Sequence, residues 1–372
     1  MTPNDYRVLL INLSTQFGGT DVRVLSQAKA LQSRVDHCAV AVLEGSKLHN
    51  RMILEGLPHH AIAHKRNSPQ LLSSLRNIMK THQYNIVDTH NVISIFWGQL
   101  AAWQAGVAGR VVTVHSDYIR ENPNLKGRAY DAVLQASRLT VKAYIQVTEE
   151  LQQTALNRGI KNTTWIPNAV AMPDSPLQQK DTSSYDEWGF ATDDRVIGIV
   201  GRLHPVKGHQ YLIDALGLLP DMPKIKLLIV GDGDLRDALE QQVNALDIAD
   251  RVHFTGFRDD IAHIMQSIDA LCIASLSEAH PFVLLEAAAY ARPIIATSVG
   301  GLKTLLRDKD TALMVEASNP EQLADALKYL ATHPDEAQRL GVSAYEMVKA
   351  QFSTEKIIHS ILNIYEKAVH EG

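Results

Sequence analysis

The sequence predicts an α/β protein made of two doubly wound domains, each with a parallel β-sheet. Three observations support this: the chain length, the alternation of short apolar runs with amphipathic stretches, and a polar segment near the middle. The 372 residues exceed one ordinary domain of roughly 100–200 residues and suffice for two hydrophobic cores. With 45% hydrophobic and 21% charged residues, the composition excludes disordered, collagen-like and disulfide-scaffold proteins.

Short apolar runs in the first half predict the strands of one sheet, with amphipathic helices such as residues 22–31 and 69–80 between them. Strands that alternate with helices pair in parallel and are covered on both faces. Residues 89–109 carry no charged side chain but contain Asn, Gln and Gly, which favours a buried helix over a membrane span. The predicted strands are residues 6–13, 38–43, 86–89, 111–115, 143–148 and 164–166.

The second half repeats this alternation after a segment that is rich in Pro, Ser, Thr and Asp. We therefore predict a first domain at residues 1–170, a linker at 171–194 and a second domain at 195–352. Residues 353–372 form a separate C-terminal helix by their apolar spacing. The strands predicted for the second domain are residues 195–200, 226–230, 252–255, 270–274, 293–297 and 312–315.

The net charge of −5 hides an asymmetry between the two halves. Residues 1–170 carry 18 Lys and Arg against 11 Asp and Glu, whereas residues 171–372 carry 18 against 30. The basic half could face an anionic surface, or its charges could simply be solvated; the sequence leaves both open. Cys38 and Cys272 lack metal or redox spacing, and together with a first segment that reads as a strand they predict a cytoplasmic protein.

The first predicted strand ends in a turn with adjacent glycines, Gly18 and Gly19, before a helix. Such a turn lets the backbone approach a ligand closely, and the helix start offers free N–H groups to an anion. A tight turn without a ligand explains the pattern equally well. The spacing GxGxxG of dinucleotide-binding turns is missing, which argues against a dinucleotide cofactor.

A stronger signal follows the strand at residues 195–200, in the sequence GRLHPVKG. Arg202 and Lys207 stand five positions apart on a glycine-bounded loop before a helix. A guanidinium fork and an ammonium point charge suit a diphosphate. The pattern GxxxxGK[ST] is not matched, so this is no P-loop; an exposed basic loop is the alternative interpretation.

Two glutamates after the strand at residues 270–274 form a third candidate. Glu278 lies in a loop, and Glu286 falls inside the apolar run VLLEAAAYA. A carboxylate in such a run is costly unless it meets a partner, such as sugar hydroxyls or a cation. A structural salt bridge for Glu286 and a helix cap for Glu278 are the alternatives.

Together these segments resemble family 4 of the retaining glycosyltransferases. The resemblance runs from the Gly18-Gly19 turn to the C-terminus and includes GRLHPVKG, Gly231-Asp232-Gly233, residues 254–257, the two glutamates and Val299-Gly300-Gly301. It implies the GT-B fold: two Rossmann-like domains facing across a cleft, with the C-terminal helix crossing back to the first. The chain departs from the family pattern at Ala279, where glycine is common, and at Thr304, where an acid is common.

The resemblance also implies roles for single residues. Arg202 and Lys207 would neutralise the donor diphosphate, Glu286 would hold the ribose hydroxyls and Glu278 the transferred sugar. His115 matches a histidine that contacts the sugar, and it joins Glu278, Arg202 and Lys207 as a predicted catalytic residue. The remaining donor-binding residues implied by the resemblance are Gly19, Phe257, Arg258, Ala279, His280, Pro281, Phe282 and Val283.

We therefore expect a retaining glycosyltransferase that moves a sugar from a nucleotide-diphosphate sugar to a glycan or lipid-linked acceptor. As the donor we expect a UDP-sugar in preference to a GDP-sugar. The expected setting is polysaccharide or glycolipid synthesis on the inner face of a membrane, with no metal, no other cofactor and no nucleic acid as partner. The basic amphipathic stretch at residues 69–80 could lie on anionic lipid or pack inward. A nucleotide-sugar epimerase and a non-catalytic partner subunit of the same fold remain as alternatives.

Overall fold

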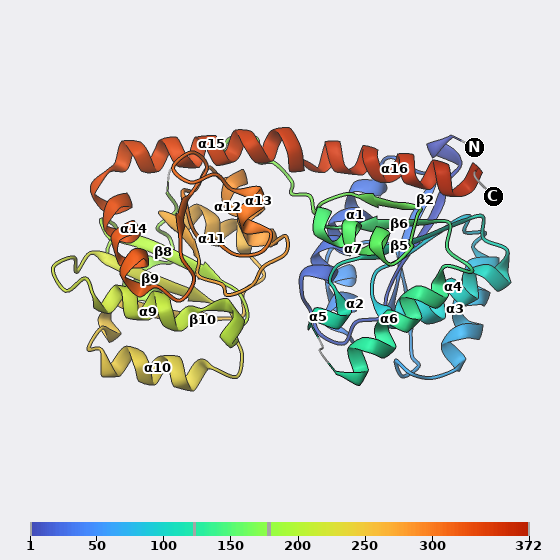
Figure 1. Cartoon of the computed structure of the whole chain (residues 1–372), viewed down its shortest axis with the longest axis horizontal. Coiled ribbons are helices and arrows are strands. Elements are labelled where there is room, and N and C mark those ends of the chain that lie inside the picture. The colour runs from blue at the N-terminus through green and yellow to red at the C-terminus, as the bar shows by residue number, and fades with distance from the viewer. Residues whose placement is uncertain (1, 122–123, 177–179, 371–372) are drawn as a thin grey trace. The chain divides into compact units, whose positions relative to one another are not determined.

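The computed structural model describes residues 2–121, 124–176 and 180–370. Residues 177–179 of the expected linker, residues 371–372 of the expected C-terminal helix and residues 1 and 122–123 of the expected first domain lie outside the described residues. The chain divides into two compact units (Figure 1). Unit 1 combines Met1–Ala169 with Thr354–Gly372, and unit 2 is Val170–Ser353.

Unit 1 contains a seven-stranded parallel sheet in the order β3-β2-β1-β4-β5-β6-β7. Apolar residues on β1 alternate between the two faces: Val8 and Leu10 belong to one core cluster, Leu9 and Ile11 to another. Burial on both faces explains the continuous apolar runs of these strands. The strands are β1 (Arg7–Asn12), β2 (His37–Leu43), β3 (His59–Ile62), β4 (Ile86–Thr89), β5 (Gly109–Val114), β6 (Ala143–Gln146) and β7 (Thr163–Trp165).

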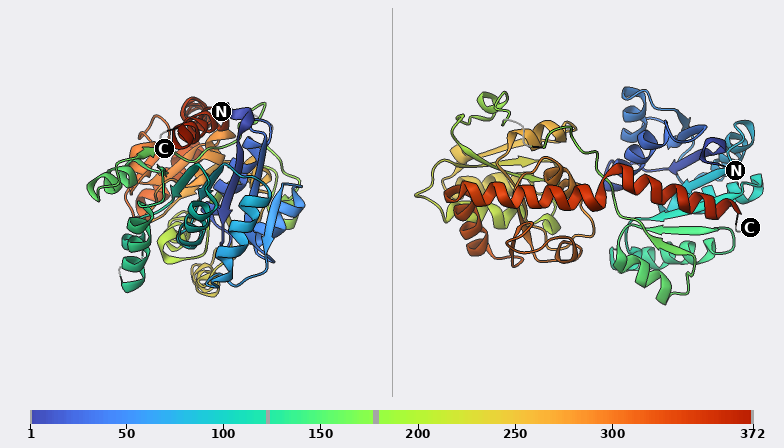
Figure 2. Two further views of the ribbon diagram at one scale, coloured as in Figure 1. Left: turned by 90° about the vertical axis from the view of Figure 1, so that its right-hand side faces the viewer. Right: turned by 90° about the horizontal axis from the view of Figure 1, so that it is seen from above.

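Helices cover both faces of this sheet (Figure 2). Asn91 caps α4 by accepting a hydrogen bond from the Ser94 N–H, and Gly106 ends it in the left-handed conformation. The uncharged run at residues 89–109 is thus a strand end, a packed helix and a turn. The helices are α1 (Gly19–Leu31), α2 (Lys47–Leu54), α3 (Gln70–Thr81), α4 (Val92–Ala105), α5 (Tyr118–Glu121), α6 (Leu125–Ser137) and α7 (Glu149–Asn157).

Strand β3 was not predicted. It is short, its sequence HHAI has only weak strand preference, and it lies at the edge of the sheet, where it pairs with β2 alone. His59 and His60 therefore lie on this edge strand, and a hydrogen bond of 2.7 Å joins His60 Nε2 and Tyr84 Oη.

Unit 2 contains a six-stranded parallel sheet in the order β10-β9-β8-β11-β12-β13. All six strands were predicted to within one or two residues. They are β8 (Arg195–Val200), β9 (Ile225–Val230), β10 (Val252–Gly256), β11 (Ala270–Ile273), β12 (Ile294–Thr297) and β13 (Leu313–Val315). The helices are α8 (Tyr185–Trp188), α9 (His209–Gly217), α10 (Arg236–Ala245), α11 (Ile261–Ser267), α12 (Phe282–Ala289), α13 (Leu302–Leu305), α14 (Pro320–Thr332) and α15 (Pro334–Phe352).

The expected linker at residues 171–194 is wrong in its second part. Tyr185, Trp188 and Phe190 are buried in a core cluster of unit 2, and the Tyr185 hydroxyl donates a 2.7 Å hydrogen bond to the Ser267 carbonyl. Three aromatic side chains supply enough apolar surface to anchor this segment, although it has no strand pattern.

The last helix, α16 (Thr354–His370), belongs to unit 1 although it follows α15 of unit 2 directly in sequence. It packs on β5 and α1, and Figure 1 shows it, in red, along the unit that contains the blue N-terminal elements. Ile357, Ile358, Ile361, Ile364 and Tyr365 are buried in the same cluster as β1. Among the described residues, no helix has the length and apolar character needed to cross a bilayer.

Candidate functional site

The strand order of each sheet reverses at one point, between β1 and β4 in unit 1 and between β8 and β11 in unit 2. Ligands of open α/β sheets bind beyond the carboxyl ends of the strands at such a point. In unit 2 the loops after β8 and β11 contain GRLHPVKG and the Glu278 segment. The candidate residues of unit 2 therefore lie where this fold class places its ligands.

Backbone contacts hold these two loops together. The Leu276 N–H donates a 2.7 Å hydrogen bond to the Val206 carbonyl. Gly208 has a φ of +68°, and a Cβ built there would lie 2.0 Å from the Ala274 carbonyl oxygen. Glycine is the residue that allows both this left-handed conformation and this close approach. Gly208, the last residue of GRLHPVKG, is therefore required for the two loops to pack against each other.

Lys207 and Glu278, predicted as separate site residues, are in direct contact. The Lys207 Nζ lies 2.5 Å from Glu278 Oε1, which also accepts a 2.8 Å hydrogen bond from Ser275 Oγ. Arg202 is exposed, and its guanidinium has no ion pair or hydrogen bond within the described part of the chain. Unit 2 thus presents one cation paired with a carboxylate and one unpaired cation on the same loop.

The Val299-Gly300-Gly301 motif positions the Glu278 loop. The Gly301 N–H donates a 2.8 Å hydrogen bond to the Glu278 carbonyl, and a Cβ on Gly301 would lie 1.6 Å from the Ala279 carbonyl oxygen. No side chain fits in that space. The motif is therefore required for backbone contact with the loop that carries Glu278.

Glu286 lies on α12 among buried Leu284, Leu285 and Ala287. Burial raises the pKa of its carboxyl to about 7. Its carboxyl group has no hydrogen bond or ion pair within the residues that the structure describes, so the salt bridge considered from the sequence is not found there. Glu286 is half-buried, and a carboxylate in such a setting without a partner among the described residues is available for a ligand.

The other predicted donor-binding residues differ in accessibility. Ala279 is exposed, and Pro281, Phe282 and Val283 are half-buried at the start of α12. His280 is buried, with its ring centroid 5.2 Å from that of Phe352 in an edge-to-face contact. Its ring is therefore part of the packing near the end of α15, and its role in donor binding stays a prediction.

The predicted base-binding segment follows β10. Phe257 is 54% exposed. The Arg258 guanidinium donates two hydrogen bonds, of 2.8 and 2.6 Å, to the Asp260 carboxylate. Asp260 thus orients Arg258, whereas the Phe257 ring presents an accessible apolar surface.

In unit 1, Gly19 begins α1 after β1 and is exposed. The Gly18 N–H donates a 2.9 Å hydrogen bond to Asp21 Oδ2, and the Asn12 amide donates one of 2.9 Å to Asp21 Oδ1. Burial raises the pKa of Asp21 to about 6. Asn12 and Asp21 were not selected from the sequence, although a polar residue that ends a buried strand was a usable signal.

His115 directly follows β5 and is half-buried. Its Nε2 lies 3.2 Å from Nδ1 of His90, which follows β4 and is buried. Burial lowers the pKa of both imidazoles, that of His90 to about 3. His90 was also missed, since a single histidine after a strand carried no signal by itself.

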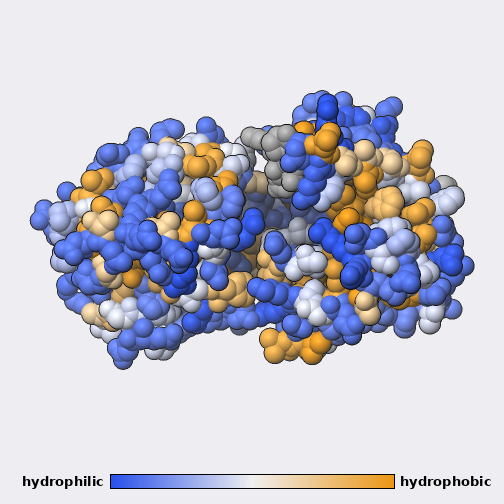
Figure 3. All heavy atoms as spheres, turned by 90° about the horizontal axis from the view of Figure 1, so that it is seen from below, coloured by the Kyte–Doolittle hydropathy of each residue, from blue (hydrophilic) through white to orange (hydrophobic). Residues whose placement is uncertain are grey.

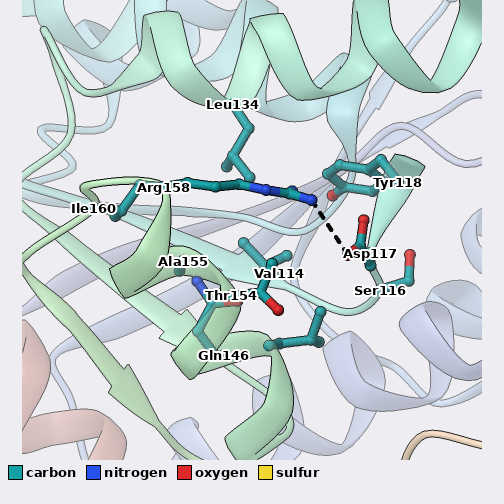
Figure 4. Close-up of a pocket in the computed structure, with 11 residues that line it drawn as sticks. Val114, Ser116, Asp117, Tyr118, Leu134, Gln146, Thr154, Ala155, Arg158 and Ile160 are labelled. Atoms are coloured by element: carbon teal, nitrogen blue, oxygen red, sulfur yellow. Dashed lines mark hydrogen bonds and ion pairs between the residues drawn. The ribbon is translucent and has the colours of Figure 1, made fainter. Parts of the chain in front are cut away.

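A small pocket in unit 1 is lined by residues that include Val114 and Ser116, the sequence neighbours of His115 (Figure 4). Arg158 reaches across it and pairs with Asp117 at 3.4 Å and Asp131 at 2.9 Å, and Figure 4 draws the first pair as a dashed line toward Asp117. Tyr118 also lines it. The guanidinium is thus held by two carboxylates, and none of these residues was selected from the sequence.

The predicted site residues divide between the units: Gly19 and His115 belong to unit 1, and the others to unit 2. In the described part of the chain, no group of three or more His, Cys, Asp or Glu side chains is arranged to hold a metal ion.

Comparison with known proteins identifies the two units. Residues 17–172 match the family described as Glycosyltransferase Family 4, and residues 181–347 match Glycosyl transferases group 1. The chain belongs to glycosyltransferase family 4. Both matches cover the carboxyl-edge loops described above, so the two halves of a family member are present in the expected order.

Curated relatives and solved structures agree with this family. The N-acetyl-α-D-glucosaminyl L-malate synthase of Bacillus anthracis is 26% identical over 301 residues, which are 79% of this chain and 78% of that protein. The UDP-Gal:α-D-GlcNAc-diphosphoundecaprenol α-1,3-galactosyltransferase of Escherichia coli is 26% identical over 69% of this chain and 68% of that protein. Several other glycosyltransferases are matched over about half of their own length.

The fold is GT-B. HepE of Anabaena, in complex with UDP and glucose, superimposes with a TM-score of 0.81 at 20% identity, over 97% of this chain and 99% of that protein. The prediction of two parallel α/β domains with the C-terminal helix in the first is confirmed.

Proposed function

We propose that this glycosyltransferase is a retaining, metal-independent enzyme that transfers a hexose-type sugar from a nucleotide-diphosphate donor, preferentially a UDP-sugar. One observation carries the proposal: on the helix that follows the Glu278 loop, Glu286 is half-buried, its pKa is raised by burial, and its carboxyl group has no partner among the described residues. Ribose hydroxyls are suitable partners because they donate hydrogen bonds to a carboxylate. HepE, solved with UDP and glucose, and the E. coli relative named for UDP-Gal support UDP as the nucleotide.

The diphosphate would bind Arg202 and Lys207. Arg202 has no partner among the described residues. Lys207, on the same loop, forms an ion pair with Glu278. On donor binding the ammonium would exchange its carboxylate partner for phosphate oxygens, which leaves Glu278 to accept hydrogen bonds from the sugar. Positive charge at the diphosphate stabilises the negative charge that develops as the bond to the sugar breaks.

The reaction proposed is a front-face displacement. The bond between the anomeric carbon and the diphosphate oxygen breaks, the acceptor oxygen bonds to the same face of that carbon, and the acceptor hydroxyl gives its proton to the leaving diphosphate. Atoms and charge balance without another reactant. His115, which belongs to unit 1, would hydrogen-bond the sugar.

We propose a glycan or lipid-linked acceptor that is reached at an anionic membrane surface. The stretch at residues 69–80 does not provide a free apolar face, because Leu71, Leu75 and Met79 of α3 are buried in a core cluster. A better candidate is the outer side of α4, where Phe96 is 46% and Trp103 55% exposed. Hydrophobic side chains are visible on the surface of unit 1 in Figure 3.

The charge of α3 and α4 supports docking of this surface on an anionic membrane. Neither α3 nor α4 contains an acidic residue, and Arg76 of α3 lies within 3.5 Å of Gln104 of α4. Exposed aromatic side chains beside cations suit an anionic lipid interface. In co-sedimentation with vesicles containing phosphatidylglycerol, we expect the double variant Phe96→Ser, Trp103→Ser to bind less, and Leu246→Ser, exposed in unit 2, to bind like the wild type. Equal sedimentation with neutral and anionic vesicles would contradict membrane docking.

Transfer assays test the proposed activity. Lys207→Ala and Glu286→Ala should each lower transfer from a UDP-sugar by about two orders of magnitude or more without unfolding the protein. Matched controls are Lys328→Ala and Glu346→Ala, which change exposed residues on α14 and α15. Turnover near that of the wild type in both site variants would refute the assignment, and release of a rearranged donor without any acceptor would favour an epimerase.

A further inference from the structure

A buried polar network lies beneath His115 in unit 1. Asp88, at the end of β4, is fully buried and accepts three hydrogen bonds: from Gln27 Nε2 at 3.0 Å, from the Tyr365 hydroxyl at 2.8 Å and from Thr113 Oγ1 at 2.9 Å. These donors come from α1, the C-terminal helix α16 and β5. The three bonds occupy both carboxylate oxygens, which suits the ionised form of Asp88.

The network continues to His115 through His90. The His90 Nε2 lies 3.6 Å from Asp88 Oδ2, which is beyond hydrogen-bond distance, and this nitrogen has no hydrogen-bond partner among the described residues. A carboxylate at this distance still favours an N–H over a lone pair on the nitrogen that faces it. On the other side of the ring, His90 Nδ1 lies 3.2 Å from His115 Nε2. Asp88, His90 and His115 therefore form a continuous line from the core to the carboxyl edge of the sheet.

The charged neighbours of this line are few. Arg23 of α1 is buried beside it and donates a hydrogen bond to the Pro167 carbonyl. Arg23 and burial lower the pKa of both histidines, so both imidazoles are neutral at pH 7. Burial raises the pKa of Asp88 above its ordinary value, although the three hydrogen-bond donors and the positive charge of Arg23 act in the opposite direction and favour the carboxylate.

A neutral imidazole has one N–H donor and one acceptor nitrogen. The Asp88 carboxylate favours the proton of His90 on Nε2, which faces it. His90 Nδ1 is then an acceptor, so His115 must place its own proton on Nε2 to form the contact between the rings. The remaining nitrogen of His115, Nδ1, then has only a lone pair, and it has no hydrogen-bond partner among the described residues.

We propose that Asp88 and Tyr365 are positioning residues that hold His115 in the Nε2–H tautomer, so that Nδ1 accepts a hydrogen bond from a sugar hydroxyl. The inference rests on the proposed contact between His115 and the donor sugar. An acceptor nitrogen pairs with a hydroxyl but not with a carboxylate oxygen or a C–H group. The site therefore selects a donor sugar with a free hydroxyl at this position over the corresponding uronic acid or deoxy sugar.

The direct test is NMR of full-length protein with ¹⁵N-labelled histidine, which distinguishes protonated from unprotonated ring nitrogens. We expect wild-type His115 as the Nε2–H tautomer at pH 7. In Asp88→Asn the amide N–H₂ can donate toward His90 Nε2, which then becomes the acceptor nitrogen. Both histidines would switch tautomer, and the His115 proton would move to Nδ1. Wild-type His115 with Nδ1 protonated, or an unchanged tautomer in a folded Asp88→Asn, would overturn the inference.

Tyr365→Phe keeps the buried ring and removes one hydrogen bond to Asp88, so it remains informative if Asp88→Asn fails to fold. We expect a mixture of the two His115 tautomers in this variant. Asp36→Asn, an exposed carboxylate paired with Arg7, is the matched control and should leave the spectrum unchanged. A Tyr365→Phe spectrum identical to that of the wild type would remove Tyr365 from the proposal.

Kinetics give a second readout. Asp88→Asn should lower kcat/KM for the hydroxylated donor by about a hundredfold, leave the Kd for the free nucleoside diphosphate unchanged, and reduce the preference over the deoxy donor to near one. An unchanged preference in a variant with switched tautomer overturns the selectivity inference. Loss of activity in Lys207→Ala tests the proposed function separately, because Lys207 lies in unit 2 and outside this network.

Discussion

At the scale of single residues, the site in unit 2 combines a paired cation with a cation and a carboxylate that have no partner in residues 2–121, 124–176 and 180–370. Lys207 and Glu278 neutralise each other at 2.5 Å, while Glu286 has no partner among the described residues and a pKa raised to about 7 by burial. Unsatisfied groups of this kind reduce stability and are kept where a ligand uses them. Two predictions follow from these charges.

Glu286→Gln should increase stability and weaken nucleotide binding. The pKa of Glu286 is raised in the folded state, so the folded protein binds more protons than the unfolded chain between its ordinary pKa of 4.5 and about pH 7. Stability is therefore lost as pH rises through that window. At pH 8 the variant should gain up to about 3 kcal/mol, seen as a higher Tm, and lose affinity for UDP.

The control Glu346→Gln, an exposed glutamate on α15, should change neither the Tm nor the affinity. The gain in Tm of Glu286→Gln should disappear near pH 4. A lower Tm of Glu286→Gln at pH 8 would mean that the carboxylate has a stabilising partner and no ligand role.

Glu278→Gln should separate donor binding from transfer. The change removes the carboxylate that pairs with Lys207 and that competes with the diphosphate for the ammonium. We expect UDP to bind as tightly as in the wild type or a few-fold more tightly, while transfer falls about a hundredfold because the amide is a poorer acceptor for the sugar hydroxyls. Calorimetry and initial rates measure the two effects, and parallel losses of both would contradict the separation.

The sequence singled out Arg202, Lys207 and Glu286 as candidates for the site of unit 2, because they stand in short motifs whose chemistry is readable without a structure. It could not predict that Lys207 and Glu278 pair, since 71 positions separate them. It also missed Asp88 and His90, because a single polar residue at a strand end gains meaning only when the fold places it against His115. The burial of His280 against Phe352 was not predictable either, because it depends on tertiary packing.

At the scale of elements, the loops after β8, β11 and β12 act as one assembly that is held by backbone contacts. Strand alternation was predicted well because each strand is buried on both faces and so reads as a continuous apolar run. The edge strand β3 and the aromatic anchor near α8 were missed, since neither follows that pattern. The glycines of the loops were recognised, but the contacts that require them appear only in the fold.

Gly301→Ala should disrupt this assembly. Its Cβ would lie 1.6 Å from the Ala279 carbonyl oxygen, so the Glu278 loop must move, at a cost of about 2–3 kcal/mol. We expect a lower Tm and a loss of transfer larger than the stability change explains. Gly18→Ala, where nothing lies within 4 Å of the added Cβ, is the control for stability, and an equal Tm for the two variants would contradict the packing argument.

Helix α16 should contribute strongly to the stability of unit 1. Ile361 is 2% exposed in the cluster that includes β1. Ile361→Ala should lower the free energy of unfolding by about 3 kcal/mol. Denaturant unfolding measures this, with Ser360→Ala, a partly exposed neighbour, as the control; a change below about 0.5 kcal/mol would show that α16 is loosely attached.

At the scale of the whole molecule, the proposed reaction assigns different tasks to the two units. Unit 2 contains the cations and the carboxylates for the donor, and unit 1 contains His115, Gly19 and the basic surface proposed for the acceptor side. The chain passes between the units twice, and next to these passages the Val170 N–H donates a 3.0 Å hydrogen bond to the Phe352 carbonyl. The net charge of the second half is negative, so the placement of two cations on one loop matters more for donor binding than the total charge.

The central claim is that unit 2 binds a nucleoside diphosphate through Lys207 and Arg202. Calorimetry with UDP and UMP on the wild type and on Lys207→Ala tests it most directly. We predict that the wild type binds UDP at least about tenfold more tightly than UMP, an advantage of about 1.4 kcal/mol, and that Lys207→Ala loses most of this advantage while it still binds UMP. Equal affinities for UDP and UMP in the wild type, or an unchanged ratio in Lys207→Ala, would contradict the account.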